Sequence, residues 1–421
     1  MIANIIVNEI GINYQEAMSD LIQGISIIET AMYTVGRNTN IEEFSDGEYH
    51  RETRKPLGII AAILPYSSLV TTIMRTVIPA LATGNCVIVK PSQLTLQTIE
   101  CITECVVSAG VPSGVFQVLP GSMAVVHALC TSPDVAAVSF FGSSAEAQVV
   151  FNRCLTAGKR VLAFGGAKNH VLALPDCDVQ TTVQDIVAGF TACAGQRCLA
   201  VSVLILVGDG SESMQKAFMD SLVAEIVTVA SRVEAGQKIG QFGPLINGAA
   251  RDRVIEYINE AEAAGCKILL DGRSWATERT TGYWVGPTII LHSNASDRAM
   301  KEEIFGPVLS VYCATSWDEA ITIENSNPYG TATSVYTERG AHAEWFVPRL
   351  RAGMIGVNEC FPPNREPTYF SPADGSLSKF GSHELTGDRA MDFFTSRVHV
   401  TARWVAPNVG TAAAASPARV V

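Results

Sequence analysis

One short segment of the chain has the residue types of a nucleophilic site. Residues 192–198 read Ala-Cys-Ala-Gly-Gln-Arg-Cys, between a helix-like pattern and an apolar strand pattern. The small residues let backbone and substrate come close together. A thiolate attacks carbonyl carbons, and the cation of Arg197 favours the thiolate form of Cys198. We predict that Cys198 is a nucleophile. A structural cysteine is the alternative that residue type alone leaves open, and Cys193 fits a packed core thiol.

The segments around this site alternate between short β-branched runs and helical patterns. We expect strands at 58–64, 86–90, 116–119, 136–141, 160–164, 201–207, 283–291, 308–313, 334–336 and 354–357. We expect helices near 68–83, 122–130, 144–157, 178–194 and 212–234. This alternation implies right-handed crossovers and parallel sheets. Residues 36–53 look polar and extended, and residues 394–401 alternate like a late strand.

Composition narrows the class of protein. A chain of 421 residues exceeds the ~250–300 residues of a single core, so two major domains are expected. The net charge is −11 and no Lys/Arg cluster interrupts it, so nucleic acid is not an expected partner. No apolar run reaches the ~20 residues of a membrane span, and no targeting segment is visible. The 11 cysteines form no CxxC pair, which favours a reducing compartment and predicts no metal site.

Several ordered motifs resemble the aldehyde dehydrogenase superfamily, over a stretch from about Asn8 to Trp404. They are Val-Lys-Pro-Ser at 89–92, Phe-Phe-Gly-Ser at 140–143, Gly-Gln-Arg-Cys at 195–198 and Glu-Glu-Ile-Phe-Gly-Pro at 302–307. The phrase Gly-Ala-Lys-Asn-His at 166–170 is similar to the methylmalonate-semialdehyde dehydrogenase branch. The order of these motifs, rather than any one of them, makes the resemblance specific.

The resemblance implies a fold and a domain plan. A doubly wound α/β cofactor domain is expected at 1–35 and 54–166, and an α/β catalytic domain at 167–386. A β oligomerisation arm is expected at 36–53 and 387–404, followed by a disordered tail at 405–421. Because extended segments expose unpaired backbone groups, the two parts of the arm should pair with each other or with another subunit. A homodimer or homotetramer is expected. Family members carry roughly ~80–100 further residues before this start, so the cofactor domain is expected to be N-terminally incomplete.

The resemblance also implies NAD as cofactor. In the family, residues matching Lys90 and Glu303 hold the two riboses, and the residue matching Phe305 packs on the nicotinamide. The turn matching Gly142 and Ser143 lies under the pyrophosphate, where free helix N–H groups favour anions. The other positions expected to contact the cofactor are Ser92 and Gln93.

Phe164 bears on the reaction. Most aldehyde dehydrogenases have a Glu at the matching position that activates water, and the methylmalonate-semialdehyde branch has Asn there. Phenylalanine accepts no proton, so hydrolysis of a thioester lacks its base. A coenzyme A thiol attacks a thioester without such help. The resemblance therefore implies a coenzyme A-dependent oxidation of a small semialdehyde, giving propionyl-CoA from methylmalonate semialdehyde or acetyl-CoA from malonate semialdehyde.

Other positions depart from the family pattern. Ser67 replaces an Asn whose amide helps to hold the oxyanion, a loss typically worth ~10²–10³ in turnover. Gln23 replaces an Arg that pairs with the substrate carboxylate, while Arg197 matches the second such Arg and remains. Gln93 replaces a ribose-binding Glu, so NADP is less strongly excluded, and Ala147 replaces a Gly of the pyrophosphate turn. A catalytically silent homologue acting as a structural or interaction subunit is therefore the alternative function. The family resemblance implies the mitochondrial matrix in a eukaryote, and the cytoplasm otherwise.

Overall fold

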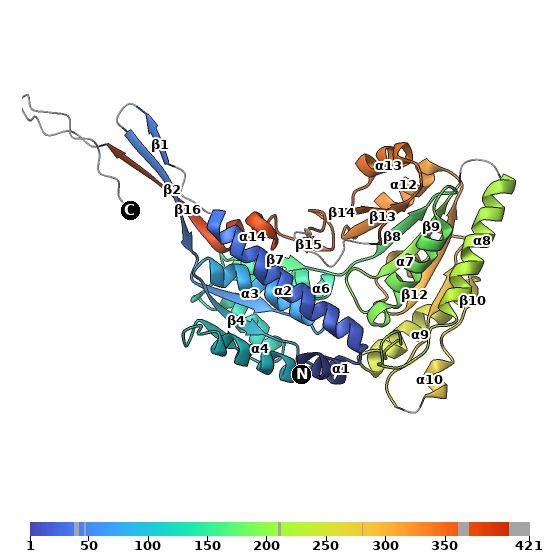
Figure 1. Ribbon diagram of the computed structural model, residues 1–421, viewed down its shortest axis with the longest axis horizontal. Coiled ribbons are helices and arrows are strands. Elements are labelled where there is room, and N and C mark those ends of the chain that lie inside the picture. Colours follow the sequence, from blue (N-terminus) through green and yellow to red (C-terminus); the bar gives the residue numbers. More distant parts are fainter. Residues whose placement is uncertain (38–41, 46–47, 209–211, 280, 361–369, 404–421) are drawn as a thin grey trace, which may run out of the picture.

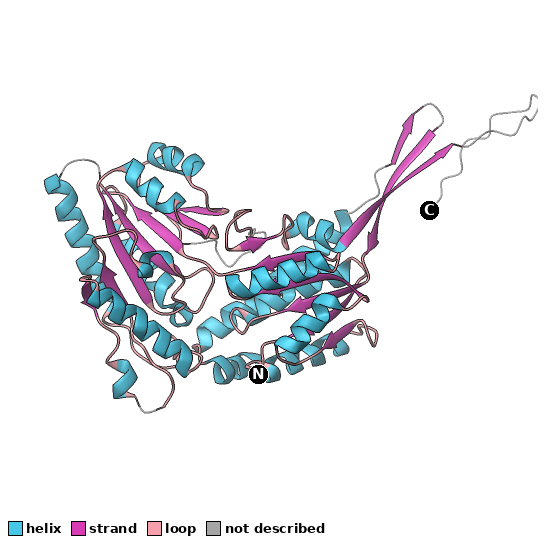
Figure 2. Cartoon of the chain, turned by 180° about the vertical axis from the view of Figure 1, so that it is seen from behind, coloured by secondary structure: helices cyan, strands magenta, loops and turns pink. Residues whose placement is uncertain are grey.

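The computed structural model describes residues 1–37, 42–45, 48–208, 212–279, 281–360 and 370–403. Figure 1 shows two lobes, each built on one large sheet, and a narrow sheet that projects away from the first lobe. Figure 2 gives the opposite view, in which helices cover the sheets of both lobes. No helix in the described ranges combines the length and the apolar composition of a membrane span.

The first lobe holds a six-stranded sheet in the order β15-β7-β6-β3-β4-β5. All neighbours are parallel except β15, which pairs antiparallel with β7. The strands are β3 (Ile59–Ile63), β4 (Cys86–Lys90), β5 (Phe116–Val118), β6 (Val135–Phe141), β7 (Arg160–Phe164) and β15 (Lys379–Phe380).

Alternation along these strands explains why helices cover both faces of the sheet. In β3, Ile60 and Ala62 belong to one buried cluster, and Ala61 and Ile63 belong to another. Because successive side chains of a strand point to opposite faces, both faces need an apolar cover. One face packs on α1 (Ile2–Ile10), α3 (Leu69–Ala82) and α4 (Leu96–Ser108), and the other on α5 (Met123–Thr131) and α6 (Ser144–Thr156).

Carboxylates from the N-terminal helices cap two helices of this lobe. Asp20 of α2 (Tyr14–Arg37) accepts the N–H groups of Val70 and Thr71 at 2.9 and 3.1 Å. Glu9 of α1 accepts the N–H groups of Gln97 and Thr98 in the same way. These N–H groups have no partner within their own helices, and a negative charge at a helix start is favourable. The caps fix α1 and α2 against the sheet.

The second lobe holds a seven-stranded sheet in the order β10-β11-β12-β9-β8-β13-β14, in which only the β10–β11 pair is antiparallel. The strands are β8 (Asn169–Ala173), β9 (Val201–Val207), β10 (Lys267–Leu270), β11 (Thr288–Leu291), β12 (Val308–Ala314), β13 (Ala332–Tyr336) and β14 (Met354–Val357). The larger helices are α7 (Val179–Thr191), α8 (Glu212–Ala230), α9 (Gly248–Ala263), α12 (Trp317–Asn325) and α13 (Gly340–Phe346). Short helical turns are η1 (Ala192–Gly195), α10 (Trp275–Glu278), α11 (Arg298–Lys301) and η2 (Val347–Arg349).

The projecting sheet joins two segments that lie far apart in the sequence. β1 (Glu42–Ser45) pairs with β2 (Glu48–Pro56), which pairs antiparallel with β16 (Thr395–Arg403). The expected pairing between the two extended segments is thus confirmed within one chain. Helix α14 (Gly387–Phe394) precedes β16, so the beginning of the predicted arm is helical rather than extended. The tail expected at 405–421 lies outside the described residues.

Several boundaries from the sequence were wrong. The helix expected at 178–194 ends at Thr191, and the helix expected to reach 234 ends at Ala230. The strand expected at 283–291 begins only at Thr288, because Pro287 offers no N–H to a ladder. α2 runs to Arg37, into the segment expected to be extended. The sequence also missed β8, although residues 169–173 are entirely buried.

Candidate active site

The predicted cofactor residues gather at one edge of the first sheet. Ile63 at the end of β3 pairs with Lys90 on one side and with Phe140 on the other. The strands are parallel, so their carboxyl ends share this edge, where α/β sheets bind ligands. Ser67 follows β3 and Gly142 follows β6 at the same edge.

The predicted nucleophile lies in a turn, not in a helix. After α7 the backbone is left-handed at Cys193, Ala194 and Gly195, with φ values of 51°, 56° and 69°. A Cβ on Gly195 would lie 2.2 Å from the carbonyl oxygen of Gly306, so only glycine fits. The turn that carries Cys198 therefore packs directly against the 302–307 motif.

Asn169 holds the backbone on either side of the nucleophile. Its Nδ2 donates to the carbonyl oxygens of Cys198 and Ala200, both at 2.8 Å, and its Oδ1 accepts from the N–H of Ala332 at 3.2 Å. The side chain is 1% exposed, so these bonds form away from water. Sequence reasoning missed this role, although Asn169 belongs to the 166–170 phrase that indicated the family branch.

Gln196 joins the nucleophile turn to the loop after β3. Its Oε1 accepts from the Tyr66 hydroxyl at 3.3 Å and from the N–H of Ile246 at 2.9 Å. Its Nε2 donates to the carbonyl oxygen of Cys193 at 3.2 Å. The Gln of the Gly-Gln-Arg-Cys motif is therefore a buried brace beside Ser67, which lies half-buried next to Tyr66.

The charge environment of Cys198 differs in part from the expectation. Arg197 lowers the pKa of the thiol as predicted, and Arg75 and the N–H of Cys198 also lower it. Burial is the largest influence, however, and together with Glu303 it raises the pKa above its ordinary value. The predicted effect of Arg197 is therefore present, but in the free protein desolvation outweighs the guanidinium charges.

Arg75 is a functional candidate that sequence reasoning missed. It lies on α3, is 7% exposed, and its guanidinium carbon is 5.2 Å from the centre of the Phe370 ring. Arginine is rarely buried unless it is paired. The sequence did offer an indication of this role, because Arg75 is the one charged residue within Leu69–Ala82.

The 302–307 motif meets the first lobe at the end of β7. Glu303 accepts the N–H of Ala167 at 2.9 Å, and a Cβ on Gly166 would lie 2.3 Å from its carboxylate. Burial raises the pKa of Glu303, while the Ala167 N–H lowers it. Phe305 has a φ of 54°, and its ring meets the edge of Tyr66 with 6.4 Å between centroids. The predicted ribose and nicotinamide residues thus lie beside the nucleophile turn.

Lys168 is a buried cation next to Glu303. The side chain is 1% exposed, and its Nζ has no hydrogen-bond partner among the described residues. Burial lowers the pKa of Lys168 to about 7, although Glu303 and Glu302 act to raise it. Near neutral pH the ammonium is therefore partly deprotonated.

The predicted pyrophosphate turn carries a carboxylate. Ser143 caps α6 by accepting the N–H of Glu146 at 3.3 Å, and its hydroxyl donates to Glu146 Oε2 at 3.0 Å. Burial lowers the pKa of Lys90, and Glu146 acts in the opposite direction. Gly142 donates its N–H to the carbonyl oxygen of Phe164. The Glu146 carboxylate thus lies where the anionic pyrophosphate was expected, and no pattern in the sequence indicated this.

The remaining cofactor candidates lie on the loop after β4. Ser92 is half-buried, and its hydroxyl accepts the N–H of Leu94 at 3.2 Å. Gln93 is exposed on the same turn. Both lie at the sheet edge with Lys90, and neither contacts the nucleophile turn in the described bonds.

Phe164 lies in an aromatic cluster instead of facing open space. It is 1% exposed and stacks on Phe141 at 4.6 Å, while Phe370 meets its edge at 5.3 Å. The neighbours are themselves apolar rings, so the cluster provides no general base. The expectation that position 164 cannot activate water agrees with this environment.

The side chain of Gln23 forms a hydrogen bond with the neighbouring helix α3. Its Oε1 accepts from the Thr71 hydroxyl at 3.0 Å. Nearby on α2, Glu16 accepts the N–H of Cys193 at 2.6 Å. Burial raises the pKa values of Glu16 and Asp20, and the cation of Arg197 acts to lower both. The charge of Arg197 therefore acts on carboxylates of this chain as well as on Cys198.

Comparison with known proteins agrees with this arrangement. A sequence profile described as the aldehyde dehydrogenase family matches residues 1–400. The chain belongs to the aldehyde dehydrogenase family. It is 34% identical to a malonate-semialdehyde dehydrogenase of Oceanobacillus iheyensis over 406 residues, covering 96% of this chain and 82% of that protein. It is 33% identical to the mitochondrial, acylating methylmalonate-semialdehyde dehydrogenase of Arabidopsis thaliana, covering 95% of this chain and 65% of that one.

Solved structures of this aldehyde dehydrogenase family share the fold. A methylmalonate-semialdehyde dehydrogenase from Oceanimonas doudoroffii superposes with a TM-score of 0.91 at 32% identity, covering 97% of this chain and 83% of that one. A protein from Sinorhizobium meliloti, complexed with NAD and named for the same activity, gives 0.90 at 29% identity, with coverages of 97% and 82%. The predicted fold and family are confirmed.

Proposed function

We propose that this aldehyde dehydrogenase oxidises malonate or methylmalonate semialdehyde through a thioester on Cys198 and transfers the acyl group to coenzyme A. The observation that carries the proposal is the half-buried Cys198 thiol, which has Arg197 next to it in the chain and is also influenced by the charge of the buried Arg75. A semialdehyde of this class carries a carboxylate, which arginine recognises through charge-assisted hydrogen bonds. The names of the similar proteins support the same substrate class.

The residues at the sheet edge fit NAD as cofactor. Lys90 offers a half-buried cation, α6 offers its N-terminus, and the half-buried Glu303 offers a carboxylate whose neighbour Gly166 leaves room for it. Bound NAD supplies the hydride acceptor. Glu146 opposes the pyrophosphate and so weakens binding of either dinucleotide. The exposed Gln93 no longer repels a 2′-phosphate, which lowers the selectivity for NAD over NADP. We therefore expect weak binding of NAD, with NADP as a second acceptor.

The chemistry of the chain begins with the sulfur of Cys198. Its thiolate forms a bond to the aldehyde carbon, and the carbonyl oxygen becomes an oxyanion held by the N–H of Cys198 and the Ser67 hydroxyl. Loss of a hydride from that carbon re-forms the carbonyl and leaves a thioester. The coenzyme A thiolate then bonds to the acyl carbon and the bond to Cys198 breaks. The C–C bond to the substrate carboxylate also breaks, which releases carbon dioxide, and the carbon that held the carboxylate takes up a proton from water.

Coenzyme A is required because position 164 offers no base for water. Phe164 and its neighbours Phe141 and Phe370 are apolar rings. A thiol needs no such base to attack a thioester. Coenzyme A therefore releases the acyl group where water does not.

The projecting sheet supports a proposal about assembly. β16 is an outer strand of this three-stranded sheet and presents one row of backbone groups away from β2. Such edges pair with other chains unless they are covered. We propose that β16 joins a homodimer or homotetramer. Static light scattering that finds a monomer at micromolar concentration would contradict this.

Formation of the reduced nucleotide tests the function directly. Purified protein is mixed with malonate or methylmalonate semialdehyde, NAD or NADP, and with or without coenzyme A, and absorbance of the reduced nucleotide is followed. Without coenzyme A we expect one equivalent of reduced nucleotide per active site, and with coenzyme A we expect continued turnover. Cys198→Ser should abolish both signals. A wild-type protein that forms no reduced nucleotide, even stoichiometrically, would instead support the silent-subunit alternative.

A further inference from the structure

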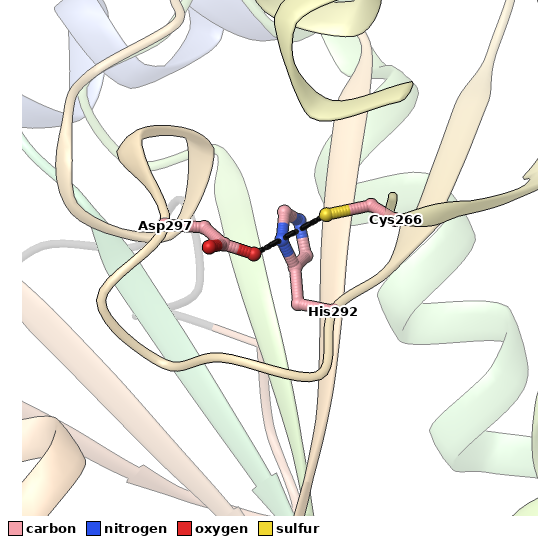
Figure 3. A group of neighbouring side chains, drawn as sticks. All are labelled: Cys266, His292 and Asp297. Carbon is pink, nitrogen blue, oxygen red and sulfur yellow. Dashed lines mark hydrogen bonds and ion pairs between the residues drawn. The ribbon is translucent and has the colours of Figure 1, made fainter. Parts of the chain in front are cut away.

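Three side chains with metal-binding chemistry meet at one point in the second lobe. Cys266 precedes β10, His292 follows β11, and Asp297 precedes α11. Figure 3 shows the imidazole between the thiol and the carboxylate, all directed at one another. One ligand atom from each residue lies within 4.8 Å of the others. Their separations of 26 and 31 residues from Cys266 gave no sequence signal.

The geometry is that of a chelate and not of a catalytic relay. His292 Nδ1 is 2.8 Å from Asp297 Oδ2 and 3.4 Å from Cys266 Sγ, and Sγ is 3.2 Å from the same Oδ2. In a relay the histidine contacts its carboxylate with one ring nitrogen and its nucleophile with the other. Here both partners meet Nδ1, whereas Nε2 is buried and has no partner in the described ranges.

We propose that Cys266, His292 and Asp297 bind a zinc ion. Thiolate, imidazole and carboxylate together are ligands for borderline-soft transition metals, and thiolate is a poor ligand for Mg²⁺ or Ca²⁺. Tetrahedral zinc with ordinary bond lengths separates nitrogen from oxygen by ~3.3 Å and sulfur from oxygen by ~3.6 Å. The observed contacts reach these values by opening about half an ångström or less. The hydrogen bonds between the three groups are thus replaced by bonds to one ion.

The surroundings allow a fourth ligand from solvent on one side. The His292 side chain is 0% exposed, while that of Asp297 is 19% exposed. Water reaches the site past Asp297, so zinc would hold three protein ligands and one water. This is the coordination of zinc sites that keep an open position.

Zinc at this point would tie an outer sheet strand to the cofactor loop. β10 pairs only through an irregular register with β11, and α11 runs directly into Glu302 and Glu303. The Ser310 hydroxyl donates to the carbonyl oxygen of Ala299 in α11. An ion held by Cys266 and Asp297 therefore fixes the start of the segment that positions Glu303. The expected role is structural support or regulation of that loop.

Cobalt and zinc binding test the proposal without reference to catalysis. Cys198→Ser serves as the background, because the candidate nucleophile is itself a metal-binding thiol. Co²⁺ is added to this protein, and the thiolate-to-cobalt band and the visible bands of tetrahedral cobalt are recorded. Zn²⁺ affinity is measured by competition with a chromophoric chelator. In the same background, Cys266→Ser and Asp297→Asn remove ligands, and Cys105→Ser removes an exposed thiol of α4 as the matched control.

We expect one tightly bound ion, loss of the thiolate band in Cys266→Ser, and a fall in Zn²⁺ affinity of more than ~100-fold in that variant. Asp297→Asn should weaken binding but keep the thiolate band, and Cys105→Ser should change neither. Zn²⁺ should raise the thermal midpoint of the background protein and not that of Cys266→Ser. A cobalt spectrum that persists unchanged in Cys266→Ser, or the absence of stoichiometric binding, would overturn the proposal.

Discussion

Replacing Lys168 with methionine should stabilise the protein at neutral pH. The Nζ of Lys168 is buried without a hydrogen-bond partner among the described residues, and burial lowers its pKa from 10.5 to about 7. An unfolded chain restores the ordinary pKa. Between these two pH values the unfolded state therefore binds more protons than the folded state, and stability rises with pH.

The size of the effect follows from that difference. A change of one pKa unit corresponds to 1.36 kcal/mol, so a fall from 10.5 to about 7 costs the folded state ~4 kcal/mol at pH 7. The cost shrinks through pH 8 and 9 and vanishes near 10.5. Lys168→Met keeps the length and apolar volume of the side chain and removes the charge. The gain in the free energy of unfolding of Lys168→Met over the wild type should decline in the same way as pH rises.

Scanning calorimetry at pH 7, 8, 9 and 10 measures this difference. For a lobe of about 200 residues, ~4 kcal/mol corresponds to a rise of roughly 10 °C in Tm at pH 7. Lys159→Met is the matched control, because Lys159 is also buried but donates to the carbonyl oxygens of Ser132 and Val135. That variant should lower Tm. If Lys168→Met lowers Tm, or shifts it equally at every pH, the inference of an unpaired buried ammonium is wrong.

Four further predictions concern the site. The alkylation rate of Cys198 by iodoacetamide should keep rising above pH 9, because burial raises the pKa of the thiol, and Arg197→Met should slow it at each pH; a plateau below pH 8 would contradict this. Ser67→Asn should raise the single-turnover rate of nucleotide reduction by ~10-fold or more through a better oxyanion donor, with Ser67→Ala as the control that lowers it. Phe164→Glu should lower Tm, because it removes a buried aromatic stack and buries a carboxyl group. The fraction of this variant that folds should release more of the carboxylic acid in the absence of coenzyme A. An unchanged Tm would contradict the described aromatic cluster. Glu146→Gln should tighten NAD binding by about tenfold in titration calorimetry, because it removes a carboxylate from the start of α6, and equal affinity would show that the pyrophosphate lies elsewhere.

The sequence determined the parts that depend on local pattern. The runs 160–164, 201–207 and 354–357 were predicted to the residue as strands, because β-branched residues bounded by turn signals leave few alternatives. The 302–307 and 195–198 motifs indicated the family, since their wording is specific and their order is fixed. The same wording did not reveal that Gln196 braces Tyr66 or that Asn169 holds the backbone of Cys198.

Tertiary structure decided the properties that depend on distant neighbours. The sequence indicated that Arg197 lowers the pKa of Cys198, and it does, but burial by residues far along the chain has the larger effect and raises that pKa overall. Glu146 became important only when folding set it beside Ser143 and Lys90 at one sheet edge. The sequence separations of Cys266, His292 and Asp297 match no metal-binding motif. They come together only because β10 pairs antiparallel with β11. Desolvation and contact between segments are properties of the folded chain, because neither exists until the core excludes water.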